Sequence, residues 1–234
     1  MTSLFIVTSA IHTDYGECVT KDRIEQTRET LESIKTHAPD SSVVIIDGGN
    51  KSVDNDMFDC EVINYANHEE IQYHLHEFLT TCDDINPGII AKAILEIMKI
   101  EEYLKNMTGS YERIFKISGR YKLNSKFNYS THLEAKDKVV ILQPRLSDCI
   151  YRSDVKATMM QYMTRCWSFD SSLLSEIIQT FGKMKKDVLY ASKTRKQADI
   201  EHLLYKHLKK KIVKTIGVMG VEGYWAPAGV LIKE

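Results

Sequence analysis

The chain has 234 residues, of which 43% are hydrophobic and 27% are charged. These values are ordinary for a globular protein and exclude a largely disordered chain. The length allows one large α/β domain or two small ones, and with only 4 prolines and 11 glycines there is no evident linker. We therefore expect a single domain.

The net charge of −1 hides an uneven distribution of charged residues. Residues 1–110 contain 8 Lys and Arg against 20 Asp and Glu, whereas residues 111–234 contain 23 against 12. The most basic segment spans residues 183–214. Two interpretations stay open for it: a solvated helical face, or a surface that receives the phosphates of a nucleotide or a nucleic acid.

Two features predict a cytoplasmic location without membrane insertion. The N-terminal apolar run has no basic region before it, and the longest apolar segment, residues 88–100, is too short to span a bilayer and is interrupted by Lys92, Glu96 and Lys99. The five cysteines are dispersed without CxxC spacing, which is typical of reduced thiols.

Strand and helix patterns alternate along the chain. Apolar runs predict strands over residues 4–7, 43–46, 60–63, 113–117, 139–142 and 164–169. Helical spacing of apolar residues predicts helices over residues 22–37, 173–184 and 199–211, and another that opens at Asn86-Pro87-Gly88. This alternation predicts a Rossmann-like, mostly parallel sheet with helices on both faces.

Small and polar residues follow three of these strands, where open α/β sheets bind their ligands. They are Thr8 and Ser9, then Asp47-Gly48-Gly49, then Ser118-Gly119-Arg120-Tyr121. We expect a nucleotide here, with the Arg120 fork suited to a diphosphate. The alternatives are that Asp47-Gly48-Gly49 is only a turn, and that Arg120 pairs with a surface carboxylate.

Several familiar fingerprints are absent from the sequence. It contains no G-x-G-x-x-G, no Walker P-loop and no G-x-S-x-G elbow, which disfavours dehydrogenases, P-loop ATPases and α/β-hydrolases. The D-x-D-like segment Asp54-Asn55-Asp56 lies in a polar loop, and the spacing of His68, His74 and His76 matches no compact metal motif. We interpret these acids and histidines as solvated groups.

The last predicted helix opens with Asp199, Glu201 and His202, and Lys206 lies one turn beyond. A carboxylate or an imidazole at this point could take a proton from an acceptor hydroxyl. The alternative is that the acids only suit the positive end of the helix dipole.

Motifs spread over most of the chain resemble the small bacterial and phage glycosyltransferases of the GT-A-like, nucleotide-sugar-binding type. They are the segments 4–10, 23–34 and 45–48, the strand end Lys116-Ile117-Ser118-Gly119-Arg120-Tyr121, the late Ile200-Glu201-His202, and the terminal Gly220-Val221-Glu222-Gly223-Tyr224-Trp225-Ala226-Pro227-Ala228-Gly229. The resemblance implies a nucleotide-binding half over residues 1–125 and an acceptor-binding half over residues 126–234.

The resemblance also implies roles for individual residues. The nucleotide and its phosphates would contact Thr8, Ser9, Arg23, Asp47, Gly48, Ser118, Gly119 and Arg120. Asp199, Glu201 and His202 would be catalytic, and Lys206, Lys210, Glu222 and Tyr224 would bind the acceptor. The usual enzyme has a D-x-D where this chain has Ser118-Gly119-Arg120, so the use of a divalent metal is in question and Arg120 could supply its charge.

Our leading hypothesis is a glycosyltransferase that uses a nucleotide-sugar as co-substrate and no certain cofactor. The acceptor is a glycan precursor or, as in some phage enzymes, a modified base in DNA, which the lysines near the C-terminus would suit. The alternative is a non-catalytic nucleotide- or nucleic-acid-binding protein on the same fold.

Overall fold

The computed structural model describes residues 2–13, 19–81, 87–147, 159–194, 198–225 and 230–234. The strands of its main sheet are β1 Ser3–Ser9, β2 Ser42–Asp47, β3 Glu61–Asn64, β4 Arg113–Ser118, β6 Val139–Leu142, β9 Cys166–Asp170 and β10 Val213–Ile216. This 7-stranded sheet has the order β10-β6-β9-β4-β1-β2-β3. All neighbours pair in parallel except β9, which runs antiparallel between β4 and β6. The predicted mostly parallel sheet is confirmed.

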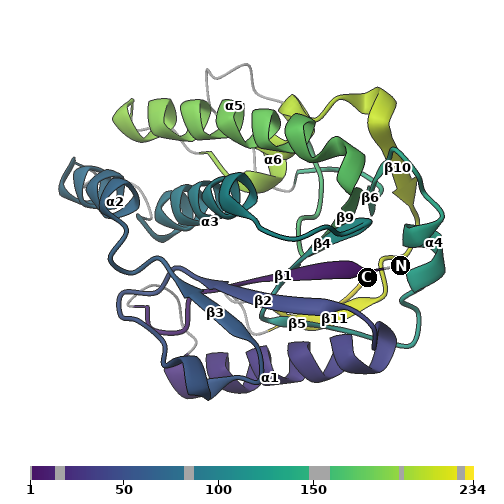
Figure 1. Ribbon diagram of the computed structural model, residues 1–234. Coiled ribbons are helices and arrows are strands. Elements are labelled where there is room, and N and C mark those ends of the chain that lie inside the picture. The colour runs from purple at the N-terminus through teal and green to yellow at the C-terminus, as the bar shows by residue number, and fades with distance from the viewer. Residues whose placement is uncertain (1, 14–18, 82–86, 148–158, 195–197, 226–229) are drawn as a thin grey trace.

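Helices cover both faces of the sheet, as predicted (Figure 1). They are α1 Thr20–His37, α2 Glu69–Thr81, α3 Pro87–Asn106, α4 Tyr129–Leu133, α5 Leu174–Lys193 and α6 Ile200–His207. Helix α1 covers one face, while α2, α3, α5 and α6 lie on the other. None of these helices is long and apolar enough to cross a membrane.

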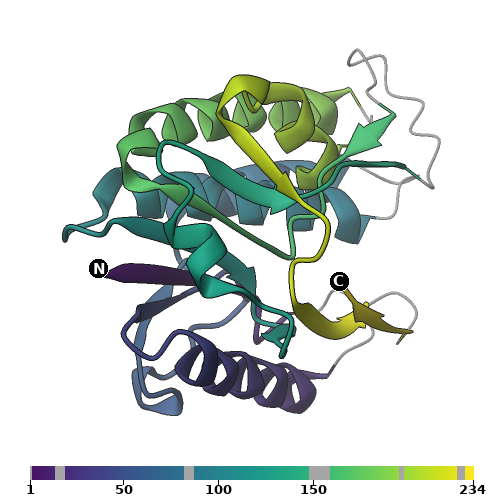
Figure 2. The same cartoon turned by 90° about the vertical axis from the view of Figure 1, so that its right-hand side faces the viewer.

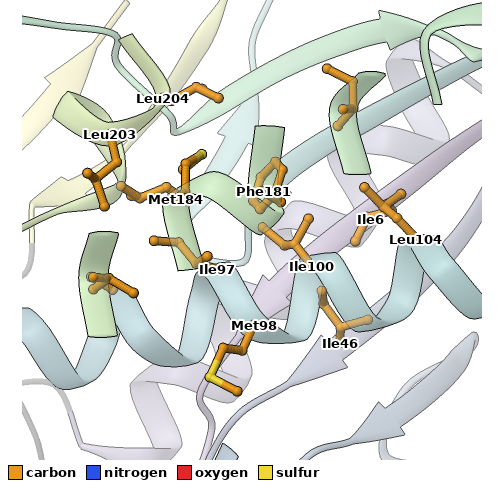
Figure 3. Close-up of a cluster of buried hydrophobic side chains, with 14 of the residues drawn as sticks. Ile6, Ile46, Ile97, Met98, Ile100, Leu104, Phe181, Met184, Leu203 and Leu204 are labelled. Carbon is orange, nitrogen blue, oxygen red and sulfur yellow. The ribbon is translucent and has the colours of Figure 1, made fainter. Parts of the chain in front are cut away.

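Strands β1 and β2 contain uninterrupted runs of apolar residues, without alternating polar residues, because both faces of the sheet are buried. Leu4 and Ile6 of β1 join the core beneath α3 and α5, whereas Phe5 and Val7 join the core beneath α1. Figure 3 shows the first of these clusters, in which Ile6 of β1 lies with residues of α3, α5 and α6.

The inner face of α1 is lined by hydroxyl groups as well as apolar side chains. The Thr27 hydroxyl donates to the Gly119 carbonyl at 3.3 Å, and the Thr30 hydroxyl donates to the Tyr121 carbonyl at 2.9 Å. The Ser33 hydroxyl accepts from the Leu123 amide at 3.0 Å. These bonds satisfy backbone groups that follow β4, so α1 fixes the position of the Gly119–Leu123 segment.

A second, antiparallel sheet consists of β5 Tyr121–Leu123, β11 Val221–Trp225 and β12 Val230–Lys233. Figure 2 shows β11 and β12 in yellow near the C-terminus. Close approach explains the first glycines of the terminal motif: a Cβ on Gly223 would lie 2.2 Å from the Arg120 carbonyl oxygen. One on Gly220, whose φ is +76°, would lie 2.2 Å from the Phe127 nitrogen. Because β11 pairs with β5, the second half of the chain packs against the first. The division into two binding halves stays a prediction.

A short third sheet pairs β7 Arg145–Leu146 with β8 Met160–Gln161, and 3₁₀ turns occupy Asn55–Met57, Ser171–Leu173 and Lys210–Ile212. Cys60 and Cys166 are free thiols. The other three cysteines, the predicted N-cap Asn86 and residues 226–229 of the terminal motif lie outside the described residues.

Candidate active site

The three predicted strand ends meet at one edge of the sheet. The parallel register sets Thr8 beside Ser118 on one side and beside Ile46 on the other, and it sets Ser9 beside Asp47. Strand β1 is the point where the chain order reverses, because β2 and β3 lie on one side of it and β4 on the other. In open α/β sheets the crevice outside such a switch point is the usual ligand site.

Asp47 holds the loops after β1 and β2 together. It is 1% exposed, and its Oδ2 accepts from the Ser9 hydroxyl at 2.6 Å and from the Ile11 amide at 2.9 Å. Its Oδ1 accepts from the Gly49 amide at 2.8 Å. A Cβ on Gly49 would lie 2.5 Å from the His12 carbonyl oxygen, so these loops touch. Asp47 therefore orders the loops at this edge of the sheet, and its predicted contact with the nucleotide stays untested.

Lys99 of α3 forms hydrogen bonds to the ends of two strands at the same edge. Its Nζ donates to the Ser9 carbonyl at 2.6 Å and to the Ile46 carbonyl at 3.1 Å, which joins the ends of β1 and β2. Burial lowers the pKa of Lys99 to about 8, against the opposing charges of Asp47 and Glu96. Gly48 lies next to this lysine, and a Cβ added to Gly48 would lie 3.5 Å from Lys99 Nζ.

Gly119 allows α1 and β1 to pack closely against the end of β4. Its amide donates to the Thr8 carbonyl at 2.9 Å, and an added Cβ would lie 3.0 Å from the Thr27 hydroxyl. Arg23, one turn before Thr27 on α1, donates from Nη1 to the Ala10 carbonyl at 3.2 Å. The predicted Thr8, Ser9, Arg23 and Gly119 thus lie together around the end of β1.

Two cations at this edge are not in direct contact with a carboxylate of the described residues, although the charges of Glu96 and Glu201 act on Lys92. Within the described part of the chain, neither the half-buried Arg120 nor the exposed Lys92 of α3 has a hydrogen-bond or ion-pair partner. The charges of Arg120, of Glu96 and Lys116, and of Glu201 all act on the Lys92 ammonium, so these groups gather around one point. The alternative of an Arg120 paired with a surface carboxylate does not hold among these residues. Two unpaired cations suit a ligand with at least two negative charges.

The acids predicted at the last helix divide into two roles. Asp199 is the N-cap of α6: its Oδ1 accepts from the His202 amide at 2.8 Å and lies 2.7 Å from His202 Nδ1. Glu201 is half-buried, and its Oε1 accepts from the Thr164 hydroxyl at 3.0 Å. Burial, followed by the negative charge of Asp199, raises the pKa of Glu201, while the charge of Lys92 opposes this rise. Asp199 therefore orients the helix end and the imidazole, and Glu201 is the carboxyl group whose protonation the site adjusts.

Most of the residues predicted to bind the acceptor contact other side chains of the protein. Lys206 donates to Asp187 Oδ2 at 2.6 Å, and the Lys210 ammonium lies 3.3 Å from the centre of the Tyr205 ring. Glu222 lies 3.5 Å from Lys233, and Tyr224 is exposed at the end of β11 that approaches Arg120. Their roles stay predictions.

The end of β4 does not fit a carboxylate-bound divalent metal. Ser118-Gly119-Arg120 supplies no carboxylate, and Arg120 adds a positive charge to this segment. No three His, Cys, Asp or Glu side chains in the described ranges are placed to share an ion. The acids of Asp54-Asn55-Asp56 are exposed.

Sequence reasoning missed the polar residues beneath the crevice. Lys92, Glu96 and Lys99 are spaced by four and three residues on α3, and this spacing within an apolar helix is a signal for one polar face. Lys116 is a cation in the middle of the apolar run of β4, between Phe115 and Ile117, which is a second signal. Nothing in the local sequence indicates Thr164, because its contact with Glu201 spans 37 positions.

Comparison with solved structures agrees with this architecture. The galactosyltransferase LgtC, solved in complex with donor and acceptor sugar analogs, superimposes with a TM-score of 0.56 at 11% identity, over 98% of this chain and 88% of its own. An active-site mutant of LgtC superimposes with a TM-score of 0.51 at 11% identity, over 92% and 72%. The likeness shows a GT-A-like, Rossmann-like fold, which confirms the predicted class at the level of fold. No model of a known protein family matches the sequence, and neither does any curated protein.

Proposed function

We propose that this protein is a glycosyltransferase that moves a sugar from a nucleotide-sugar donor to an acceptor hydroxyl. The observation that carries the proposal is the pair of unpaired cations, Arg120 and Lys92, at the switch point of a GT-A-like sheet, with the Glu201 carboxyl group beside them. A nucleoside diphosphate supplies the negative charge that such a pair suits.

The donor side of the proposed site is the crevice at the ends of β1, β2 and β4. Thr8, Ser9, Arg23 and Gly48 lie around it, and Ser118 lies beside Thr8 in the register of β4 and β1. In the transfer step the bond between the anomeric carbon and the diphosphate oxygen breaks. The leaving diphosphate keeps that electron pair, and Arg120 and Lys92 stabilise its charge.

Glu201 is the proposed general base. The acceptor oxygen forms its new bond to the anomeric carbon, and its proton moves to the Glu201 carboxylate. The raised pKa of Glu201, caused mainly by burial, brings the group closer to the working pH, which is favourable for proton transfer. His202 and Asp199 orient the start of α6 that carries this carboxylate.

We propose that transfer does not require a divalent metal. The support is the ligand set at the end of β4, where Ser118 and Arg120 stand in the positions that carboxylates would need. The cations already present supply charge of the sign that a metal would bring.

A sugar hydroxyl is the acceptor that we propose over a base in DNA. Of the lysines that favoured DNA, Lys206 pairs with Asp187 and Lys209 with Glu176, and Lys210 donates to the Tyr205 carbonyl. Cations with near carboxylate partners attract a phosphate backbone less strongly than unpaired ones.

The test is an assay for nucleotide release, as a nucleoside diphosphate from UDP-, GDP- and ADP-sugars and as CMP from CMP-sugars, with glycan acceptors and with EDTA. We expect release from one donor, stimulation by an acceptor, and no loss of rate with EDTA. A non-catalytic binding protein would instead bind a nucleotide without release or transfer, and would be indifferent to changes at Glu201. That result would refute the proposal.

A further inference from the structure

The segment before β9 is attached to α6 at Glu201. The Tyr162 amide donates to the Glu201 backbone carbonyl at 3.3 Å, and the Thr164 hydroxyl donates to Glu201 Oε1 at 3.0 Å. Thr164 is only 3% exposed, so this contact is shielded from water. The Thr164 hydroxyl is the side-chain donor to this carboxylate among the described residues, and the backbone amide of Glu201 itself also donates to it. The Thr164 hydroxyl therefore determines which oxygen of the carboxylate a neighbouring side chain engages.

The backbone of Thr164 is in turn fixed by a hydrogen bond from Lys116. Its carbonyl accepts from Lys116 Nζ at 2.8 Å, and the same Nζ lies 2.5 Å from Glu96 Oε1. Glu96 Oε1 also lies 3.5 Å from the Thr8 hydroxyl. A continuous set of polar contacts thus runs from the end of β1, through α3 and β4, to Glu201.

We propose that Thr164 is a positioning residue that fixes the Glu201 carboxylate through Oε1 and presents Oε2 to the acceptor hydroxyl. This inference rests on the proposed function, because it gives Glu201 the part of a base. Lys116 contacts both the Thr164 carbonyl and Glu96, and Glu96 contacts Thr8 at the end of β1. These contacts fix the position of Thr164 relative to β1, and therefore the distance between the proposed donor and acceptor sites.

The variant Thr164→Val isolates the hydroxyl. Valine has nearly the same shape, and the Lys116 bond to the backbone carbonyl and the Tyr162 bond to Glu201 both remain. The matched control is Thr164→Ser, which keeps a hydroxyl. Thr164→Ala serves as a second variant without the hydroxyl if the valine does not fold.

The expected result is a loss in kcat of about 10- to 100-fold for Thr164→Val, as for other residues that orient a reactive group, with an unchanged KM for the donor. Removing a donor to the charged carboxylate also disfavours that form, so the rising limb of the pH–rate profile shifts to higher pH. The charged groups that face Glu201, namely Asp199 of α6 and Lys92 and Glu96 of α3, are the same in all variants. Thr164→Ser should restore both properties.

A measurement without turnover separates this inference from the proposed function. In protein labelled with ¹³C at the glutamate carboxyl carbons, the Glu201 signal is identified by its loss in Glu201→Gln and is titrated in each variant. We expect a raised midpoint in Thr164→Val and the wild-type midpoint in Thr164→Ser. An unchanged midpoint in Thr164→Val would overturn the inference even if the enzyme transfers sugar. A raised midpoint in a protein that transfers nothing would uphold the contact and refute only the proposed function.

Discussion

Lys116 and Glu96 form an ion pair in the interior, with 2.5 Å between Nζ and Oε1, directly beneath the ends of β1 and β4. Neither residue is more than 8% exposed. Burial opposes ionisation of Glu96, yet the charges of Lys116 and Lys92 dominate and lower the pKa of Glu96 to about 2. The sheet therefore contains a fixed charge pair at the point where it meets its proposed ligand.

Removing one member of this ion pair should lower the free energy of unfolding strongly, whereas replacing both members with apolar residues should lower it much less. We expect Lys116→Met to reduce the free energy of unfolding by roughly 3–5 kcal/mol, because it leaves a buried carboxylate without its partner. The double variant Glu96→Leu with Lys116→Met should lose much less. Urea denaturation of the three proteins measures this, and equal losses in the single and double variants would contradict the account.

Arg120 should matter to turnover and not to folding. Its guanidinium has no described partner, so Arg120→Ala should keep the wild-type melting temperature. The rate of transfer should fall by roughly 100- to 1000-fold, the usual effect of removing one electrostatic stabiliser of a developing charge. The control is Arg28→Ala on the exposed face of α1, and an equal loss in both variants would argue against a role for Arg120.

Glu201 should give the transfer rate its acidic limb. A base acts when deprotonated, so the rate should rise as pH increases through the pKa of Glu201, which burial holds above its ordinary value of 4.5. Glu201→Gln should abolish this limb along with most of the activity, whereas the exposed Glu32→Gln should keep both. A limb that persists in Glu201→Gln would assign the base elsewhere.

His132 should make the protein sensitive to mild acid. Its Nδ1 lies 2.7 Å from the Ser168 hydroxyl, and burial, with the charges of Arg113 and Lys214, lowers the pKa of His132 from 6.5 to about 3. Because the unfolded chain takes up the proton first, this contribution is complete above pH 6.5 and is lost as the pH falls toward 3.

The loss should approach about 1.4 kcal/mol per pH unit for this one proton. Urea denaturation between pH 7 and pH 4 should show a shallower pH dependence for His132→Asn than for the wild type. The exposed His76→Asn should keep the wild-type slope. A slope that is the same in all three proteins would show that His132 is not the group responsible.

Binding to duplex DNA should be weak and only slightly dependent on salt. Three lysines of the basic segment have carboxylate partners within 2.6 Å. Each neutralised phosphate adds about 0.9 to the slope of log K against log salt, and we expect a slope below about 3. Fluorescence anisotropy at several salt concentrations measures it, and a slope several times larger would restore DNA as the acceptor.

Much of the fold could be predicted because its strands are buried on both faces. The apolar runs over residues 4–7, 43–46 and 113–117 lie within β1, β2 and β4, and the predicted helix over residues 22–37 is α1 with two more residues at its start. Helix α5 continues to Lys193, beyond the predicted residue 184, because Val188 and Ala191 extend its buried face. Helix α6 ends at His207, before the predicted residue 211, because Leu208 is already extended.

Other elements depend on contacts that the local pattern does not contain. The antiparallel direction of β9 and the pairing of β11 with β5 arise from long-range register. The inner face of α1 uses Thr27, Thr30 and Ser33, whose hydroxyls satisfy a neighbouring backbone, so its apolar stripe describes only part of the interface.

The candidate site shows the same division. Sequence placed Thr8, Asp47 and Arg120 at one edge because parallel strands bring their carboxyl ends together. It could not show that the Asp47 carboxylate is already engaged by Ser9, or that Thr164 engages Glu201. Those assignments depend on side-chain distances between distant segments.

The central claim, a nucleotide site at the ends of β1 and β4, is tested most directly by thermal shift. Wild type and Arg120→Ala would be melted with UDP, GDP, CMP, ADP and their sugar conjugates, with and without Mn²⁺. A ligand that binds only the folded protein raises the melting temperature. We predict a rise with one nucleoside diphosphate and its sugar conjugate, independent of Mn²⁺ and strongly reduced in Arg120→Ala. No rise with any nucleotide, or an equal rise in both proteins, would contradict the claim.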